Sequence, residues 1–485
     1  MGSRGIRLVF AGVVTMTLLA AATATGSGRV VRPVRTAAPV EAEGGHLIAD
    51  GRSQLLVVQP SFTEDGGGVS RVNLDGSVDR SFSEDGRVQI ASEDAAVTAD
   101  GKILVATTSH PAGGYGQKTK ARVTRLLPDG RPDPAFGTDG HADIHFGRRY
   151  DYGEAVATAA NGDILLAGIM VEYASNYGDE DRLAVARLKP GGSLDRSFGK
   201  KGIDLLPYWG EIGALDVTPT PSGGMLVEGG NELEATFLKL RRDGSIDRGF
   251  GDGGYREIRG RPVLNGYNEE LKLVPGVDVL PNGKLLLVAT GTNRGFVSHV
   301  VAVRLRPDGR VDRSYGRNGW AVVKSPASPA GSTLLPGGDL AVATSFEGKA
   351  AKRLPFGAIA FAPDGHVDQR FGQAGRCRGR LGGRPAATGV VVVGGHVVVG
   401  GEGSPGSWLL NCPLPNELLS PRFVRAASGA GSRSHRQAGH DPAVEAAGSS
   451  SATTCSHPVM RPGSSFSRRG RCRSDRYRRG PAATP

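Results

Sequence analysis

Short blocks of consecutive apolar residues, each preceded by a glycine-containing pair, recur along most of the chain. Examples are Ile103–Val105 after Asp100-Gly101 and Leu285–Val288 after Asn282-Gly283. Asp-Gly and Asn-Gly pairs supply the positive φ angles of two-residue hairpin turns. An apolar block without alternation indicates a strand buried on both faces. The turn of this module occurs seven times, at Asp50-Gly51, Asp100-Gly101, Asn161-Gly162, Ser222-Gly223, Asn282-Gly283, Gly337-Gly338 and Gly394-Gly395.

A second module alternates with the first and ends in an aspartate, an aromatic residue and a glycine. It begins with an Asp-Gly turn such as Asp75-Gly76, and a glycine follows four residues after the aromatic, as Gly86 does after Phe82. The motif aspartates follow one another at intervals of 52 to 65 residues. The six copies of the aspartate and aromatic are Asp79 and Phe82, Asp133 and Phe136, Asp195 and Phe198, Asp247 and Phe250, Asp312 and Tyr315, and Asp368 and Phe371.

The two modules together predict a repeat of four antiparallel strands, and the chain holds about seven such repeats. A four-stranded unit cannot bury both faces alone, so the units are expected to stack around an axis as the blades of a β-propeller. The high glycine content, 74 of 485 residues, agrees with an all-β fold rich in tight turns. We therefore expect a β-propeller of seven four-stranded blades over residues 25–411.

The last repeat lacks the Asp-Gly half of its second module, and its third strand is expected near Trp408–Leu410. An extended stretch at residues 29–36 precedes the first repeat. We expect this stretch to supply the missing outer strand of the last blade and so to close the ring. Pro33 is compatible with that position because proline is tolerated on an edge strand.

The recurring string of Asp-Gly, Asp, Ser-Phe-Gly and a later Gly resembles the delta-60 repeat of secreted bacterial proteins. The resemblance covers residues 47–402 and implies a β-propeller without a single assigned function. Gly191 and Tyr315 depart from the pattern, as does the incomplete last repeat. The resemblance implies no catalytic residues.

The regular residues of the repeat have a structural interpretation. Asp79 and its equivalents are expected to cap their own loops through side-chain to backbone hydrogen bonds, with Phe82 and its equivalents between blades. The alternative is that these aspartates bind calcium, but no copy has the ligand spacing of an EF-hand. We expect no metal or other cofactor, and no catalytic constellation is recognisable. His141 and His145 lie too far apart on a strand to share one metal.

The ends of the chain differ from the repeats. Arg4, Arg7 and the apolar run to Leu19 predict a signal peptide over residues 1–24, cleaved after Ala24. Residues 411–485 hold twelve arginines and four acidic residues, so most of the formal net charge of +11 belongs to this tail. The tail, 412–485, is interpreted either as a disordered basic arm or as an out-of-frame reading. No nucleic acid is expected as a partner, because the propeller itself is nearly neutral.

An exported protein is permitted disulfides, and a Cys377–Cys412 pair would join neighbouring blades. No later segment predicts a membrane span, so we expect a protein that is secreted or in the cell envelope, and monomeric.

The glycine turns are expected on one face of the ring, and the remaining loops between strands on the other face. These remaining loops contain tyrosines, one tryptophan and acidic residues. Loops on a rigid scaffold are common binding sites, and tyrosines beside acids suit a glycan or peptide. The alternative is a set of solvated loops with scattered aromatics. The candidate ligand-binding residues are Tyr150, Tyr152, Glu154, Glu172, Tyr173, Tyr177, Tyr208, Trp209, Glu211 and Tyr267.

Three functions remain open at this point. The first is an extracellular binding or scaffold protein that uses the tyrosine-rich face. The second is a lyase or hydrolase of an extracellular polymer, with acids such as Glu154, Glu172 and Glu211 at the mouth of the central channel. The third is a structural envelope component without a specific ligand.

Overall fold

The computed structural model describes seventeen segments of the chain and is built almost entirely of strands. The described residues are 33–35, 46–61, 67–110, 118–147, 150–174, 178–206, 213–231, 234–258, 263–264, 267–268, 270–274, 276–292, 298–323, 327–346, 356–379, 386–403 and 406–419. The expected signal peptide therefore lies outside the described residues, as does the tail from residue 420 onward.

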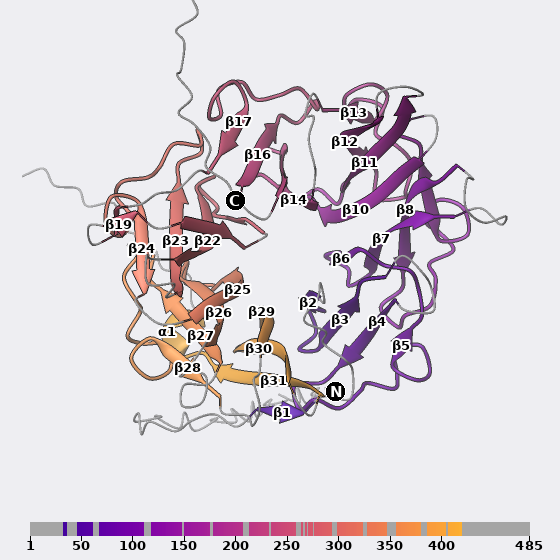
Figure 1. Ribbon diagram of the computed structural model, residues 1–485. Coiled ribbons are helices and arrows are strands. Elements are labelled where there is room, and N and C mark those ends of the chain that lie inside the picture. The colour runs from indigo at the N-terminus through magenta and orange to yellow at the C-terminus, as the bar shows by residue number, and fades with distance from the viewer. Residues whose placement is uncertain are drawn as a thin grey trace, which may run out of the picture. The chain divides into compact units, whose positions relative to one another are not determined.

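The described strands form seven antiparallel sheets of four or five strands and one two-stranded sheet, which confirms the predicted all-β propeller. Figure 1 shows the sheets around a common centre, with β2, β6, β14, β25 and β29 near it. Blades 1 to 3 consist of β2 (His46–Ala49), β3 (Leu55–Gln59), β4 (Gly68–Val72) and β5 (Arg87–Val88); β6 (Asp94–Val97), β7 (Ile103–Ser109), β8 (Lys120–Leu126) and β9 (His141–Ile144); and β10 (Tyr150–Thr158), β11 (Ile164–Ala174), β12 (Gly178–Leu188) and β13 (Ile203–Leu205).

Blades 4 to 6 continue the pattern, and blade 5 departs from it by pairing both β20 and β21 with β22. Their strands are β14 (Gly213–Pro219), β15 (Met225–Asn231), β16 (Glu234–Leu240) and β17 (Tyr255–Glu257); β20 (Glu270–Leu273), β21 (Asp278–Val279), β22 (Leu285–Thr292), β23 (Ser298–Leu305) and β24 (Trp320–Val323); and β25 (Ala327–Leu334), β26 (Leu340–Phe346), β27 (Gly357–Phe361) and β28 (Arg376–Arg378). A separate hairpin, β18 (Val263–Leu264) and β19 (Tyr267–Asn268), lies between blades 4 and 5 in the sequence.

The last blade joins the two ends of the propeller. It contains β29 (Ala386–Val393), β30 (His396–Gly403) and β31 (Gly406–Pro413), and its fourth strand is β1 (Val34–Arg35) from the start of the chain. Val34 pairs with Leu409 and Arg35 with Trp408. Strand β1 lies within the 29–36 stretch that the sequence indicated, and β29 also contacts β2 of blade 1. The ring is therefore closed by backbone pairing between residues almost four hundred positions apart.

Neighbouring blades are joined by one set of contacts that recurs around the ring, which we call the inter-blade clasp. In blade 1, Arg71 Nε lies 2.8 Å from Asp79 Oδ2, and Arg71 Nη1 donates to the carbonyl oxygen of Pro128 in blade 2 at 2.5 Å. The guanidinium carbon lies 4.9 Å from the ring centre of Phe82. One side chain thus binds the motif aspartate and aromatic of its own blade and the turn of the next blade.

The clasp repeats with Arg125, Arg187, Lys239 and Arg304 in blades 2 to 5. The backbone adds a second link, because in blades 1 to 5 the residue after the aromatic donates its N–H to the next blade's turn, as Ser83 does to Asp129 at 2.8 Å. Between blades 7 and 1, Asn411 Nδ2 donates to the carbonyl oxygen of Leu74 at 2.5 Å. Charge-assisted bonds of this kind are stronger than neutral ones, so the clasp contributes to holding the blades together.

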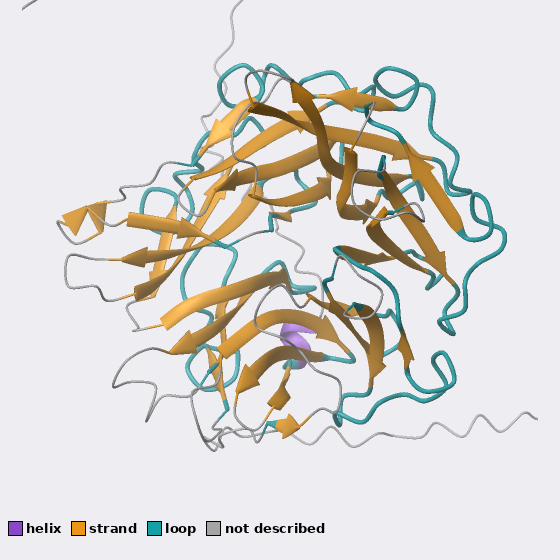
Figure 2. Cartoon of the chain, turned by 45° about the vertical axis from the view of Figure 1, so that its right-hand side comes forward, coloured by secondary structure: helices purple, strands orange, loops and turns teal. Residues whose placement is uncertain are grey.

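The junction between blades 6 and 7 is built differently. Ala360 stands where the clasp cation would be, and blade 7 has no Asp-Gly turn to receive it. A disulfide between Cys377 on β28 and Cys412 on β31 joins the two blades, with the Cα atoms 5.9 Å apart. Helix α1 (Asn416–Leu419), purple in Figure 2, adds Leu418 to the hydrophobic cluster that contains Phe371.

The described chain continues beyond residue 411, the expected end of the propeller. Cys412, Leu414 and Leu418 are buried against blades 6 and 7. Three residues that the sequence assigned to the tail are thus packed against the propeller. No helix in the described ranges is long and apolar enough to span a membrane.

Candidate functional site

Three of the ten candidate ligand-binding residues lie together on the first strand of blade 3. Tyr150, Tyr152 and Glu154 are partly exposed on β10, where Tyr150 pairs with Val171 and Tyr152 with Ile169 of β11. A β-bulge interrupts the pairing between Gly153 and Ala155. Bulges re-aim side chains and are common near binding sites, so Glu154 occupies a position where the strand departs from regular alternation.

The other seven candidates are described in part or not at all. The backbone places Glu172 and Tyr173 near the end of β11, opposite Glu180 and Asp179 of β12. Tyr267 lies on β19, opposite Leu264. Tyr177, Tyr208, Trp209 and Glu211 lie outside the described residues. Strands β11 and β12 have eleven residues each, against seven in β7 and β8 of blade 2. Blade 3 therefore extends farther on the side of the variable connections.

Two carboxyl groups occupy equivalent positions in blades 2 and 3. Glu93 directly precedes Asp94, which pairs with Ala106, and Glu154 directly precedes Ala155, which pairs with Ala167. Burial, together with the charge of Glu154, raises the pKa of Glu93 to about 7. Burial also raises the pKa of Glu154. One of these carboxyls can therefore hold a proton near neutral pH, as a general acid does.

A buried aspartate lies between the two tyrosines of β10. Asp151 Oδ1 accepts a hydrogen bond from the Gly147 N–H at 2.9 Å, and its Oδ2 lies 3.5 Å from His145 Nδ1. Burial raises the pKa of Asp151, against the hydrogen bonds and the nearby His145. The backbone of Asp151 also exchanges two hydrogen bonds with the Thr119 hydroxyl. These contacts hold the segment that carries Tyr150 and Tyr152.

A second group of acids links blades 4, 5 and 6. Glu228 Oε2 accepts from the Gly276 N–H at 2.9 Å, and Asp278 Oδ2 accepts from the Ser332 hydroxyl at 2.6 Å. Burial and the charge of Asp216 raise the pKa of Glu228 to about 8. Burial also raises the pKa of Asp278 to about 6, despite the Ser332 hydrogen bond. Among the described residues, no group of three His, Cys, Asp or Glu side chains is arranged to hold a metal ion.

The motif aspartates have both carboxylate oxygens engaged by the protein. Asp79 Oδ1 accepts from the Ser81 N–H and hydroxyl, and Oδ2 accepts from Arg71 and Gln54. Partial burial favours the neutral acid, but these hydrogen bonds and the charge of Arg71 prevail and lower the pKa of Asp79 to about 2. The same Oδ1 contact with the residue two positions on occurs in every copy of the motif.

The sequence analysis did not identify the clasp cations, although their signal is simple. Each lies eight residues before its motif aspartate, as Arg71 does before Asp79 and Arg304 before Asp312. All lie in the third strand of the blade, where the four arginines are buried and Lys239 is partly buried. A buried arginine is otherwise unusual. A search for cations at a fixed distance from the motif would have found them.

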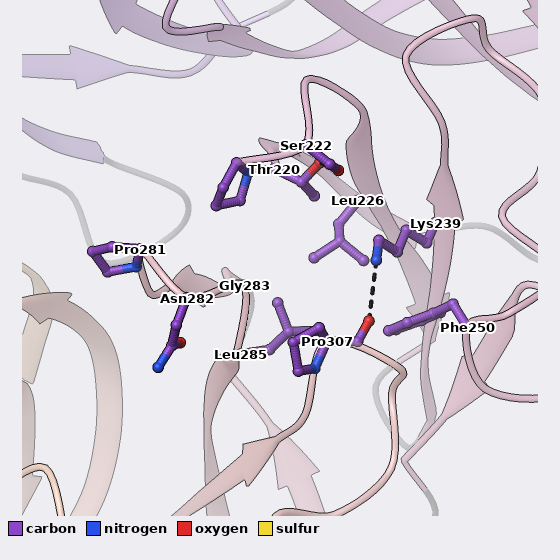
Figure 3. A pocket seen from close by; sticks show the side chains of 11 residues that line it. Thr220, Ser222, Leu226, Lys239, Phe250, Pro281, Asn282, Gly283, Leu285 and Pro307 are labelled. Carbon is purple, nitrogen blue, oxygen red and sulfur yellow. Dashed lines mark hydrogen bonds between the residues drawn. The ribbon is translucent and has the colours of Figure 1, made fainter. Parts of the chain in front are cut away.

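A cavity of about 350 Å³ lies between blades 4 and 5 on the side of the glycine turns (Figure 3). Leu226, Phe250 and Leu285 form a buried apolar floor. The turns at residues 220–222 and 281–283 and the ring of Pro307 form the rim. Lys239 reaches between floor and rim and donates to the Pro307 carbonyl oxygen at 3.0 Å. None of the candidate ligand-binding residues that the structure describes lines this cavity.

Comparisons with known proteins leave the activity open. No curated protein matches the chain by sequence. Solved structures that resemble it include a quinonprotein alcohol dehydrogenase-like protein from Bacteroides thetaiotaomicron (9% identity, 69% of this chain and 66% of that one, TM-score 0.35). Others are prolyl oligopeptidase B from Galerina marginata (11%, 76% and 47%, TM-score 0.39) and a protein of unknown function from Dyadobacter fermentans (10%, 66% and 93%, TM-score 0.36).

The chain thus spans about two thirds of the first of these proteins and about half of the second. At such identities and TM-scores, none of these likenesses carries an argument about activity. A family described as "Domain of unknown function (DUF5122) beta-propeller" matches residues 98–136, 159–198 and 280–315. These segments each run from the first turn to the motif aromatic of blades 2, 3 and 5. These three segments are thus similar to the DUF5122 β-propeller family, and the described strands form a ring of seven blades.

Proposed function

We propose that this protein is a secreted binding or scaffold propeller that recognises an extracellular glycan or peptide through the variable connections on one face. The proposal rests on a difference between the two faces of the ring: one face is occupied by contacts between blades, and the other has exposed aromatic residues and longer strands. In blades 1 to 5, the motif aspartates and aromatics of the glycine-turn face are engaged in inter-blade clasps, as in blades 1 and 2. The opposite side has the partly exposed Tyr150 and Tyr152, the lengthened β11 and β12, and the extra β18–β19 hairpin.

Tyrosines suit this role because they offer a broad apolar surface and a polar tip at a low entropic cost. Their strand is fixed by the contacts of Asp151, so the site is preorganised and little entropy is lost on binding. The export signal in the sequence, the resemblance to delta-60 repeats of secreted proteins and the Cys377–Cys412 disulfide favour an extracellular location.

A glycan and peptide array tests the proposal with the chain from residue 25 onward. We expect a restricted set of ligands, and we expect Tyr150→Ala and Tyr152→Ala each to weaken their binding at least tenfold. Arg310→Ala, an exposed change on a glycine turn of blade 5, is the matched control and should bind as the parent does. A folded protein that binds no array member would favour the structural envelope component instead.

The pair of Glu93 and Glu154 favours a second candidate, a lyase or hydrolase of an extracellular polymer. Two carboxyls with raised pKa values suit acid and base roles in such a reaction. Once a ligand is known, Glu93→Gln and Glu154→Gln distinguish the candidates. An enzyme would lose turnover by a factor of about one hundred or more while retaining ligand binding. A binding protein shows no turnover in either the parent or the variants.

A further inference from the structure

The cavity between blades 4 and 5 lies at a junction where the clasp is altered. Four of the five cationic clasp residues are arginines, and the fifth is Lys239. The arginine guanidinium carbons lie 4.5 to 5.0 Å from their aromatic ring centres, whereas Lys239 Nζ lies 5.6 Å from that of Phe250. A lysine also lacks the broad planar end of an arginine. Space that an arginine would fill is therefore left open beside Phe250.

In blade 4, a glycine stands at a position where two other blades have a lysine that reaches the motif aspartate. Lys102 in blade 2 and Lys284 in blade 5 reach the motif aspartates Asp133 and Asp312, at 3.0 and 2.8 Å. The equivalent residue of blade 4 is Gly224, directly before Met225 as Lys102 is before Ile103. A Cβ atom at Gly224 would lie 2.1 Å from the Leu240 carbonyl oxygen, so the local backbone requires glycine.

The cavity combines an apolar floor with one charged lining residue, Lys239. Lys239 Nζ is 3.3 Å from Asp247 Oδ2 and 3.0 Å from the Pro307 carbonyl oxygen, which engages two of its three N–H groups. Arg241 Nη2 lies 3.6 Å from Asp247 Oδ1. Two cations thus share one carboxylate. The Thr220 and Ser222 hydroxyls, 3.0 Å apart, add polar groups at the rim.

We propose that this cavity is a binding site for an apolar carboxylate, of the kind that the C-terminal residue of a peptide presents. The apolar side chain lies over Leu226, Phe250 and Leu285, and the carboxylate accepts from the third N–H of Lys239. The volume of about 350 Å³ falls at the lower end of the range for small-ligand pockets. The site is on the other side of the ring from Tyr150 and Tyr152, so it does not depend on the function proposed above.

Ligand-observed NMR with N-acetyl-phenylalanine and N-acetyl-leucine tests the site. We expect both acids to bind and their carboxamides to bind at least tenfold more weakly, because the amides lack the charge that Lys239 recognises. The tripeptide Ac-Ala-Ala-Phe with a free carboxyl group identifies the source: tighter binding than N-acetyl-phenylalanine points to a peptide end, and equal binding points to a free small acid. Equal affinity for acid and amide, or no binding of either acid, would overturn the proposal.

Lys239→Arg is the decisive variant, because it restores the residue that the other blades use and keeps the charge. We expect it to fold with an unchanged or higher melting temperature and to bind N-acetyl-phenylalanine at least tenfold more weakly, since the larger side chain fills the cavity. Arg304→Lys at the next junction is the matched control and should leave binding unchanged. Parent-like binding by Lys239→Arg would contradict the assignment.

Discussion

At the scale of single residues, Tyr315 departs from the repeat, and its surroundings predict how a substitution there changes stability. It takes the place of the motif phenylalanine in blade 5 and is fully buried, and its hydroxyl has no hydrogen-bond partner. A buried hydroxyl without a partner loses its hydration and gains nothing in return. Tyr315→Phe should therefore raise the free energy of unfolding by about 1 kcal/mol. Chemical denaturation measures this change in the free energy of unfolding. A variant less stable than the parent would show that the Tyr315 hydroxyl makes a hydrogen bond in the folded protein.

Arg125 allows a test of the clasp itself. Its Nε lies 2.8 Å from Asp133 Oδ2, and both side chains are almost completely buried. Removing one partner of a buried ion pair leaves the other charge without full compensation. We expect Arg125→Met to lower the free energy of unfolding by about 3 kcal/mol. The exposed Arg310→Ala should change it by less than about 0.5 kcal/mol; a similar loss in both variants would argue against the clasp.

At the scale of elements, the last blade depends on two links that the other blades do not need. Among the described residues, β31 pairs with β1 through Val34 and Arg35, and the disulfide ties β31 to β28. The 35-residue separation of Cys377 and Cys412 restricts the unfolded chain, which amounts to about 4 kcal/mol in the loop-entropy model. The disulfide therefore compensates for the missing clasp at this junction.

Replacement of both bridging cysteines measures that contribution. The double variant Cys377→Ser, Cys412→Ser should unfold at a lower denaturant concentration than the parent, with a loss of about 4 kcal/mol. Reduction of the parent protein should have a similar effect. Cys455→Ser with Cys472→Ser is the control and should behave as the parent does. A reduced protein as stable as the oxidised one would show that the bridge is dispensable.

At the scale of the whole molecule, carboxyl groups with opposite pKa shifts predict a stability maximum in mildly acidic solution. Glu93, Glu228 and Asp278, with pKa values of about 7, 8 and 6, bind protons more tightly when folded than when unfolded. Their contribution to stability is therefore lost as the pH rises from about 5 to 8. Asp79, with a pKa of about 2, is bound in its charged form, so its contribution is lost as the pH falls below about 4.

Melting temperatures measured from pH 2 to pH 9 test this expectation. We expect a maximum near pH 4 to 5 and a decline toward pH 8 of up to about 1.4 kcal/mol per pH unit for each raised carboxyl. Glu228→Gln imitates the protonated acid and should flatten the alkaline side of the curve. It should also be more stable than the parent at pH 8 and similar at pH 5. An alkaline decline unchanged in Glu228→Gln would mean that other groups cause it.

Much of the architecture was predictable because it follows from local sequence signals that recur in each repeat. Each turn needs glycine at a positive φ: Gly86, for example, has φ of 94°, and a Cβ there would lie 2.0 Å from Val78 Cγ1. The second strand of a blade begins with a continuous apolar block because it is buried on both faces, as Leu55–Val58 is. The candidate site was less predictable, since Tyr150, Tyr152 and Glu154 are not part of the repeat, and only their common strand is described.

The sequence by itself determined the repeat, its four strands and a count of about seven blades, because these follow from turn chemistry and apolar periodicity over short distances. It predicted the strand that closes the ring, and the structure established the pairing. The tertiary structure alone decided how neighbouring repeats meet. It placed Arg71 between Phe82 and the next blade's turn, joined Cys377 to Cys412, and opened a cavity where Lys239 replaces an arginine. These features depend on side chains from different blades, whose proximity is set by closure of the ring and not by any local pattern.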